Sequence, residues 1–199
     1  MPRKYDASRR RASAQETRRR ILDAAVRLHG QGVTAYEPLA SAAGVSLATV
    51  RKHFPSREHL FQGCTSHFLA NLQLPDFAAV ARVRDAGQRL IRVVELVCAL
   101  LDAAHDLVWH SAPFTDSSTA LSTAAAQLST LLDEATAALV DGPGLGLRAS
   151  SRAAVRKRVR ALLDPLTYRA FRTVAGFERV DIERELGVLL RCAVGLTST

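Results

Sequence analysis

The chain has 199 residues, a mass of 21.6 kDa and a formal net charge of +8, and 48% of its residues are hydrophobic against 23% charged. These values are typical of a globular protein with one or two domains, and they exclude a disordered tail or a collagen-like rod. No apolar run approaches the roughly 18 residues needed to span a bilayer, and no apolar segment follows the basic N-terminus as in a secretory signal, so we expect a cytoplasmic protein.

Basic residues are concentrated in the first quarter of the chain. Residues 1–57 hold twelve lysines and arginines against four acidic residues, whereas residues 58–199 hold fifteen of each. Clustered cations favour polyanions because neutralising phosphates releases counterions. The pattern predicts a polyanion-binding N-terminal module joined to a neutral body with another role. Solubility, or attraction to anionic lipid, is the alternative explanation.

Helical periodicity runs through the whole sequence, and no segment alternates at period two, so we expect an all-α protein of about nine helices. Residues 1–12 are predicted to be a disordered basic arm that either solubilises the chain or orders in a DNA minor groove. A first helix is predicted from Ser13, which forms a capping box with Glu16, to His29. Its polar arginines are expected to face solvent or phosphate: Arg18, Arg19, Arg20 and Arg27.

Two short helices joined by a glycine turn are predicted next, over residues 36–43 and 47–54. Gly44 accepts a positive φ without steric cost, and Ser46 caps the second of the two helices. This is the helix-turn-helix arrangement, whose second helix enters the major groove of DNA. Ser56 then caps a fourth helix, which is predicted to end before Pro75.

The stretch from Thr17 to Leu60 resembles the tetracycline-repressor (TetR) family of bacterial regulators. The matching residues are Ile21–Ala25, Gly32, Leu39-Ala40, Ala43–Ser46, Thr49 and His53–Leu60. The resemblance implies a helix-turn-helix DNA-binding domain over residues 13–57. It also implies a larger helical effector-binding and dimerisation domain over residues 58–199. A protein of this kind is a ligand-responsive regulator, most often a repressor, that binds a pseudo-palindromic operator as a homodimer.

Some positions depart from the family pattern. Where the family has a Gly-Thr-Leu-Tyr run in the recognition helix, this chain has Ala48-Thr49-Val50-Arg51. Arg51 replaces a tyrosine that commonly contacts a phosphate, and an arginine either contacts a phosphate or pairs with guanine. Ala35 stands where a threonine is usual, and Arg57 replaces a lysine.

Short polar and basic side chains around the predicted helix-turn-helix suit phosphates and base edges. The predicted DNA-binding residues are Thr34, Tyr36, Ser46, Leu47, Thr49, Arg51, Lys52, His53 and Arg57.

The body is predicted to contain a short helix over 77–84, a central helix over 86–104 and a long helix that Asp116 caps and that ends near Val140. A helix from residue 148 to 175, kinked at Pro165, and a last helix over 181–195 follow. In the first of these two, Arg148, Arg152, Arg156 and Arg160 form a basic face, for which a solvated surface is the favoured interpretation.

An effector needs a mostly apolar cavity with a few polar groups. The candidates, taken from segments that line the pocket in similar proteins, are Phe68, Asn71, Cys98, His105, Trp109, His110, Phe114, Tyr168 and Phe171. In the family the last two helices form the dimer interface, for which Leu186, Leu189, Leu190 and Ala193 are the candidates; these residues could equally belong to the core of one chain.

We expect no metal and no other cofactor. Cys64-x-x-His67 and the pair His105 and His110 do not supply the three or four ligands of a zinc site, and the three cysteines are too scattered for a disulfide framework. A thiol-dependent enzyme built on Cys64 and His67, or a basic surface-binding adaptor, is the alternative class of function.

Overall fold

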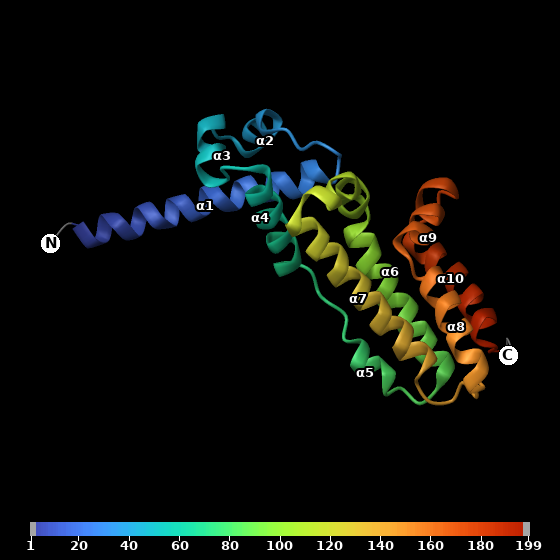
Figure 1. Cartoon of the computed structure of the whole chain (residues 1–199). Coiled ribbons are helices and arrows are strands. Elements are labelled where there is room, and N and C mark those ends of the chain that lie inside the picture. The colour runs from blue at the N-terminus through green and yellow to red at the C-terminus, as the bar shows by residue number, and fades with distance from the viewer. Residues whose placement is uncertain (1–2, 197–199) are drawn as a thin grey trace. The chain divides into compact units, whose positions relative to one another are not determined.

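The computed structural model describes residues 3–196, and within them the chain is all-α, as predicted. Ten α-helices are present, with a 3₁₀ turn at Ala112–Ser117 and a π turn at Ala170–Val174 (Figure 1). The helices are α1 (Arg3–His29), α2 (Tyr36–Ala43), α3 (Leu47–His53), α4 (Arg57–Ala70), α5 (Phe77–Ala81), α6 (Ala86–Ser111), α7 (Thr119–Val140), α8 (Ala149–Leu162), α9 (Pro165–Arg169) and α10 (Arg179–Val194). None of the described helices is long and apolar enough to cross a bilayer.

The chain divides into two compact units. Unit 1 comprises residues 1–72 and 106–125, and unit 2 comprises residues 73–105 and 126–199. Both divisions fall inside long helices, so α6 and α7 each contribute residues to both units. The predicted domain boundary after residue 57 stays a prediction; in the grouping by contacts, residues 106–125 belong with the N-terminal helices.

Unit 1 is built around the first four helices. In Figure 1, α1 passes beside α2 and α4, and α2 contacts α3. Their inward side chains form one core of Ile21, Leu22, Ala24, Ala25, Leu39, Ala40, Ala43, Val50, Phe54, Leu60 and Cys64. Burying this apolar surface fixes the two helices of the helix-turn-helix against α1.

The first helix is longer than predicted. It begins at Arg3, so the segment predicted as a disordered arm is helical from that residue on. Residues 3–29 contain no glycine or proline, and arginine and alanine are good helix formers. Ser13 therefore lies inside the helix, where its carbonyl accepts a bond from the Thr17 hydroxyl at 2.9 Å. Residues 1–2 lie outside the described part of the chain.

The predicted turn chemistry of the helix-turn-helix is confirmed. Gly44 has φ +64° and ends α2. The Ser46 hydroxyl accepts a bond from the Thr49 amide at 3.1 Å, and the Ser56 hydroxyl accepts one from the His59 amide at 3.3 Å. Each serine satisfies an amide that a helix start leaves without an intrahelical partner.

Glu58, in the first turn of α4, caps the start of α7 within unit 1. Its Oε2 accepts a bond from the Ser118 hydroxyl at 2.6 Å, and its Oε1 accepts one from the Ala120 amide at 2.8 Å. These two bonds lower the pKa of the Glu58 carboxyl. Ser118 itself accepts a bond from the Leu121 amide, so Ser118 caps α7 in place of the predicted Asp116, which lies in the 3₁₀ turn.

Unit 2 has its own apolar core, to which α5 to α10 contribute. It consists of Phe77, Val80, Leu90, Val93, Val94, Val97, Cys98, Leu101, Leu132, Ala135, Ala138, Leu139, Val140, Val155, Val159, Leu163, Tyr168, Ile182, Leu186, Leu190 and Val194. Beside it, Arg89 is fully buried and donates to the carbonyl oxygens of Val83 at 2.7 Å and Leu139 at 3.5 Å. Burial lowers the pKa of its guanidinium.

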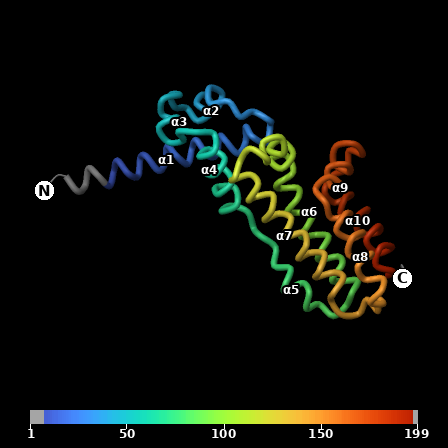
Figure 2. Tube along the Cα trace, viewed as in Figure 1, coloured from blue at the N-terminus to red at the C-terminus, as the bar shows by residue number. Residues whose placement is uncertain are grey.

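Two predicted helices of unit 2 have different bounds. The central helix continues to Ser111, because the predicted break after Ala104 contains no glycine or proline before Pro113. The predicted kinked helix is instead split: α8 ends at Leu162, and the Asp164 carboxylate caps α9 by accepting a bond from the Leu166 amide. Figure 2 follows the chain from α8 through α9 into α10.

The basic face of α8 is largely paired with acidic residues of unit 2. Arg152 and Arg156 both contact the Asp141 carboxylate, and Arg160 contacts Asp133 at 3.0 Å and Asp164 at 3.1 Å. Arg148 and Arg156 remain exposed, so this face carries ion pairs and is also in contact with solvent.

Candidate nucleic-acid interface

The helix α3 has one buried side and one exposed side. Val50 is fully buried in the core of unit 1, whereas Arg51 and Lys52 are exposed. Leu47 and Thr49 are half-buried, and the Thr49 hydroxyl lies 2.8 Å from the Ser46 hydroxyl. Val50 thus anchors the helix so that two adjacent cations face solvent, as recognition of phosphates or bases requires.

The predicted flanking residues are held in different ways. Tyr36 is half-buried, its hydroxyl donates to the Phe54 carbonyl at 3.1 Å, and burial raises its pKa. Thr34 and His53 are half-buried. Arg57 is exposed, and its guanidinium lies 5.7 Å from the centre of the Phe114 ring. Tyr36 therefore ties the start of α2 to the end of α3, in addition to any contact with DNA.

The arginines of α1 have specific partners that the sequence pattern did not reveal. Arg20 donates to the carbonyls of Ala43 and Gly44, where its charge also suits the C-terminal end of α2. Arg19 pairs with Glu16 at 2.7 Å and with Asp23 at 2.9 Å.

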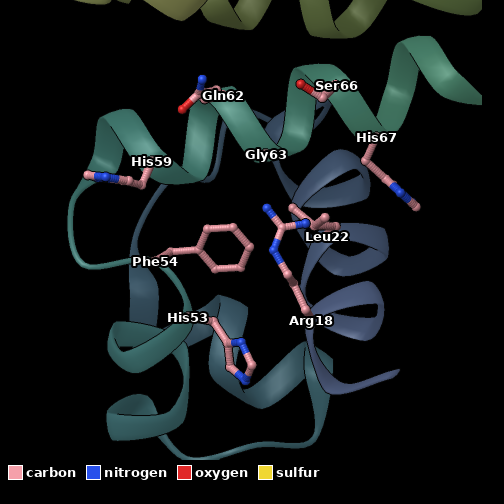
Figure 3. Close-up of a pocket in the computed structure, with 9 residues that line it drawn as sticks. All are labelled: Arg18, Leu22, His53, Phe54, His59, Gln62, Gly63, Ser66 and His67. Carbon is pink, nitrogen blue, oxygen red and sulfur yellow. The ribbon is translucent and has the colours of Figure 1, made fainter. Parts of the chain in front are cut away.

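Arg18 occupies a different position from its two neighbours. Its guanidinium carbon lies 5.0 Å from the centre of the Phe54 ring. It lines a hollow of about 480 Å³ formed by α1, the end of α3 and α4 (Figure 3). The residues around the hollow are Arg18, Leu22, His53, Phe54, His59, Gln62, Gly63, Ser66 and His67. Of these, only His53 belongs to the predicted site.

The predicted effector residues fall into both units. Phe68, Asn71, Trp109, His110 and Phe114 belong to unit 1, whereas Cys98, His105, Tyr168 and Phe171 belong to unit 2. In unit 1, Phe114 lies 5.7 Å from the Phe61 ring, and the Asn71 amide donates to the His67 carbonyl. Their common role as one effector pocket stays a prediction.

In unit 2, three of the four candidates are close together. The Tyr168 hydroxyl donates to the Asp102 carboxylate at 2.7 Å, and the His105 ring lies 6.1 Å from the Tyr168 ring. Burial, followed by that hydrogen bond, raises the pKa of Tyr168. Burial also raises the pKa of the nearby Cys98 thiol to about 12. Phe171 instead stacks on Phe177 at 6.0 Å.

The predicted dimer residues require a correction. Leu186 and Leu190 are fully buried in the core of unit 2, so neither presents its side chain to a second chain. The apolar periodicity of α10 marks the face that packs inside the chain. Leu189 is 41% exposed and Ala193 is half-buried.

The geometry around Cys64 opposes a thiol nucleophile. Cys64 is buried, and burial raises its pKa to about 12, which keeps the thiol protonated near neutral pH. His67 bonds to Asp23 through Nε2 at 2.7 Å. Among the described residues, no group of three or more histidines, cysteines or acids is placed to hold a metal ion.

Comparison with known proteins supports the DNA-binding interpretation of unit 1. The family model described as "Bacterial regulatory proteins, tetR family" matches residues 21–64, from the second half of α1 to the middle of α4. A search of curated proteins returned no match. The matched segment contains the helix-turn-helix with its exposed cations on α3. Residues 21–64 are thus similar to the DNA-binding segment of TetR-family regulators, which supports a DNA-binding transcription regulator.

Proposed function

We propose that this regulator is a repressor that binds a pseudo-palindromic operator as a homodimer and responds to a small-molecule effector. The observation that carries the proposal is the exposure of Arg51 and Lys52 on a helix anchored by the buried Val50. A two-fold dimer would place two such helices in successive major grooves, about 34–36 Å apart.

A gel-shift and footprinting experiment with the DNA upstream of the chain's own coding region tests the operator. We expect a discrete, salt-sensitive complex that protects an inverted repeat and that random competitor DNA displaces only poorly. If the chain binds random DNA and vesicles of anionic lipid as tightly as it binds the upstream DNA, a basic surface-binding protein is favoured instead.

Replacing Arg51 with alanine tests the recognition helix. If Arg51 reads a base, Arg51→Ala weakens operator binding by about 1–3 kcal/mol and relaxes the preference at one position. If it holds a phosphate, affinity falls for all sequences and the dependence of binding on salt becomes weaker. Unchanged affinity and salt dependence would contradict the placement of α3 in the groove.

Dimerisation is proposed to use the exposed side of α10. Val188 is 54% exposed and Leu189 is 41% exposed, although both are large and apolar. Gly187, beside them, has no atom of the chain within 4 Å of the position where a Cβ would lie. A glycine inside a helix costs about 1 kcal/mol relative to alanine, and here it leaves room for a helix of a second chain.

Sedimentation of the double variant Val188→Asp and Leu189→Asp tests this surface. We expect a monomer that binds a single half-site like the wild type but binds the full operator at least about tenfold more weakly, because linked binding is lost. Leu166→Asp is the matched control, since Leu166 is an exposed leucine of α9. A variant that stays dimeric would place the interface elsewhere.

For the effector, we propose the group formed by Tyr168, Asp102 and His105, which combines buried aromatic surface with an exposed carboxylate. An effector shifts a two-state equilibrium only through its different affinity for the two states, commonly by about 1–3 kcal/mol. In a reporter strain, Tyr168→Phe should change the response to an inducing compound while repression without the compound is preserved. A response equal to wild type would exclude this group.

A further inference from the structure

Three consecutive arginines of α1 differ in how their charge is used. Arg19 pairs with two carboxylates, and Arg20 donates to two backbone carbonyls at the end of α2. Arg18 is exposed and stacks on Phe54, and no hydrogen bond or ion pair joins it to another of the described residues. The structure therefore leaves the charge of Arg18 open to a ligand from outside.

The hollow that Arg18 lines has the chemistry of an anion site. None of its nine residues is acidic, and five of them carry side-chain hydrogen-bond donors: Arg18, His53, His59, Gln62 and Ser66. Asp23 lies next to Leu22 in sequence, but its carboxylate oxygens are already bonded to Arg19 and His67. A phosphate oxyanion accepts hydrogen bonds and is attracted by guanidinium groups, so these donors fit it.

Gly63 allows the hollow to exist in this form. A Cβ at Gly63 would lie 2.8 Å from the Phe54 ring and 3.3 Å from the Arg18 guanidinium. Figure 3 shows the Phe54 ring and the Arg18 side chain next to each other beside α4, with Gly63 facing them. Because α4 has no side chain there, the stacked pair packs directly against it.

His59 is bonded to Ser56 at the start of α4. The Ser56 hydroxyl oxygen accepts a bond from the His59 amide, and it lies 2.7 Å from His59 Nδ1. In the neutral tautomer in which Nδ1 accepts the Ser56 hydroxyl proton, the ring proton is on Nε2, which is then a donor.

The basic surface continues along α1 beyond the hollow. At 100° per residue, Arg11 and Gln15 fall on the same side of the helix as Arg18, and both are exposed. Arg11 precedes Arg18 by two turns, or about 10 Å along the axis. A ligand that reaches both arginines must carry more than one negative group, as a nucleic-acid backbone does.

We propose that this hollow binds a phosphate group and that the phosphate belongs to the backbone of the DNA duplex, outside the segment that α3 reads. The proposal rests on the DNA-binding function proposed above. A phosphorylated small molecule offers the same chemistry and is the other source. Such a contact adds affinity without adding sequence preference.

The test compares Arg18→Gln with Lys157→Gln in the full-length chain. One phosphate contact contributes about 0.9 to the slope of log affinity against log salt. Because the proposed dimer carries two such hollows, Arg18→Gln should lower that slope by about 2, for operator and random duplex alike, so that its loss of affinity between 50 and 200 mM salt is about tenfold smaller than that of the wild type. Lys157→Gln, an exposed lysine of α8 away from the hollow, should keep the wild-type slope. Arg18→Lys should restore most of the slope.

Two further outcomes are decisive. If the slope is unchanged in Arg18→Gln but the wild type binds inorganic pyrophosphate in calorimetry and the variant does not, the hollow is a phosphate site for a small molecule. If both the slope and pyrophosphate binding equal those of the wild type, the proposal is wrong. Failure of the wild type itself to bind its upstream DNA selectively would overturn the proposed function and not this site. Equal thermal unfolding of the two glutamine variants serves as the check on folding.

Discussion

At the scale of single residues, burial decides which titratable groups of unit 1 affect stability. His29, at the end of α1, packs edge-on against Phe61 with 5.5 Å between the ring centres. Burial lowers the pKa of His29 to about 4, so the folded protein keeps this ring neutral at pH values where an exposed histidine gains a proton. This difference links folding to pH.

The stability of the wild type should fall as the pH decreases from about 6.5 towards 4. In that interval the unfolded chain binds a proton at His29 that the folded chain does not, so protonation favours the unfolded state. Denaturant unfolding at pH 7 and pH 5 should show a loss that is about 1–2 kcal/mol smaller in His29→Phe than in the wild type. An equal loss in both proteins would place the acid sensitivity elsewhere.

Residue chemistry also explains which parts of the site were predictable. Arg51 and Lys52 are exposed, as DNA contact requires, because the helical period around Val50 turns the other side of α3 towards the core. The partners of Arg18 and Arg20 lie 36 and 23 residues away in sequence, at Phe54 and Ala43. Such contacts depend on tertiary structure, so a local charge pattern predicts only a solvated face.

At the scale of elements, the turn between α2 and α3 fixes the helix-turn-helix. Gly44 has a φ of +64°, and a Cβ there would lie 2.8 Å from the Arg20 guanidinium that binds the end of α2. An alanine would therefore be strained in its own backbone and would also displace Arg20.

Gly44→Ala should lower the free energy of unfolding by more than the cost of the backbone conformation alone, which is about 1–2 kcal/mol. Gly146→Ala is the matched control, because Gly146 has a φ of +57° and no atom within 4 Å of the Cβ position. Chemical denaturation of both variants gives the comparison. Equal destabilisation would mean that Arg20 moves without cost.

Element boundaries were predictable where local chemistry sets them. The bounds of α2 and α3 follow from Gly44 and Ser46, whose roles depend on neighbouring residues only. The predicted start of α1 at Ser13 was wrong. Ser13 and Glu16 match a capping box, but the same residues are compatible with a helix interior, where Glu16 pairs with Arg19. The predicted end of α6 was wrong because it placed a break in residues 105–111, which contain no glycine or proline to stop the helix.

At the scale of the whole molecule, the uneven distribution of charge is the property most relevant to DNA. Residues 2–12 contain five basic residues and one acidic residue. If these charges attract the duplex, their effect is largely independent of base sequence and is screened by salt.

Deleting residues 2–12 should weaken binding to operator and random DNA by similar factors and lower the slope of log affinity against log salt by about 1–4. The pair Lys157→Gln and Arg158→Gln, exposed on α8, is the control and should leave the slope unchanged. Titrations at several salt concentrations measure both. A truncated chain that loses sequence preference would show that the segment reads bases.

The continuation of α1 to Arg3 restricts how this segment can approach DNA. An α-helix with its side chains is about 10–12 Å across, whereas the minor groove of B-DNA is only about 6 Å wide. While it is helical, the segment is too thick to enter that groove, although the major groove, about 12 Å wide, admits it. Recognition of A·T-rich sequence from the narrow side of the duplex would therefore require α1 to unwind first, at the cost of its backbone hydrogen bonds.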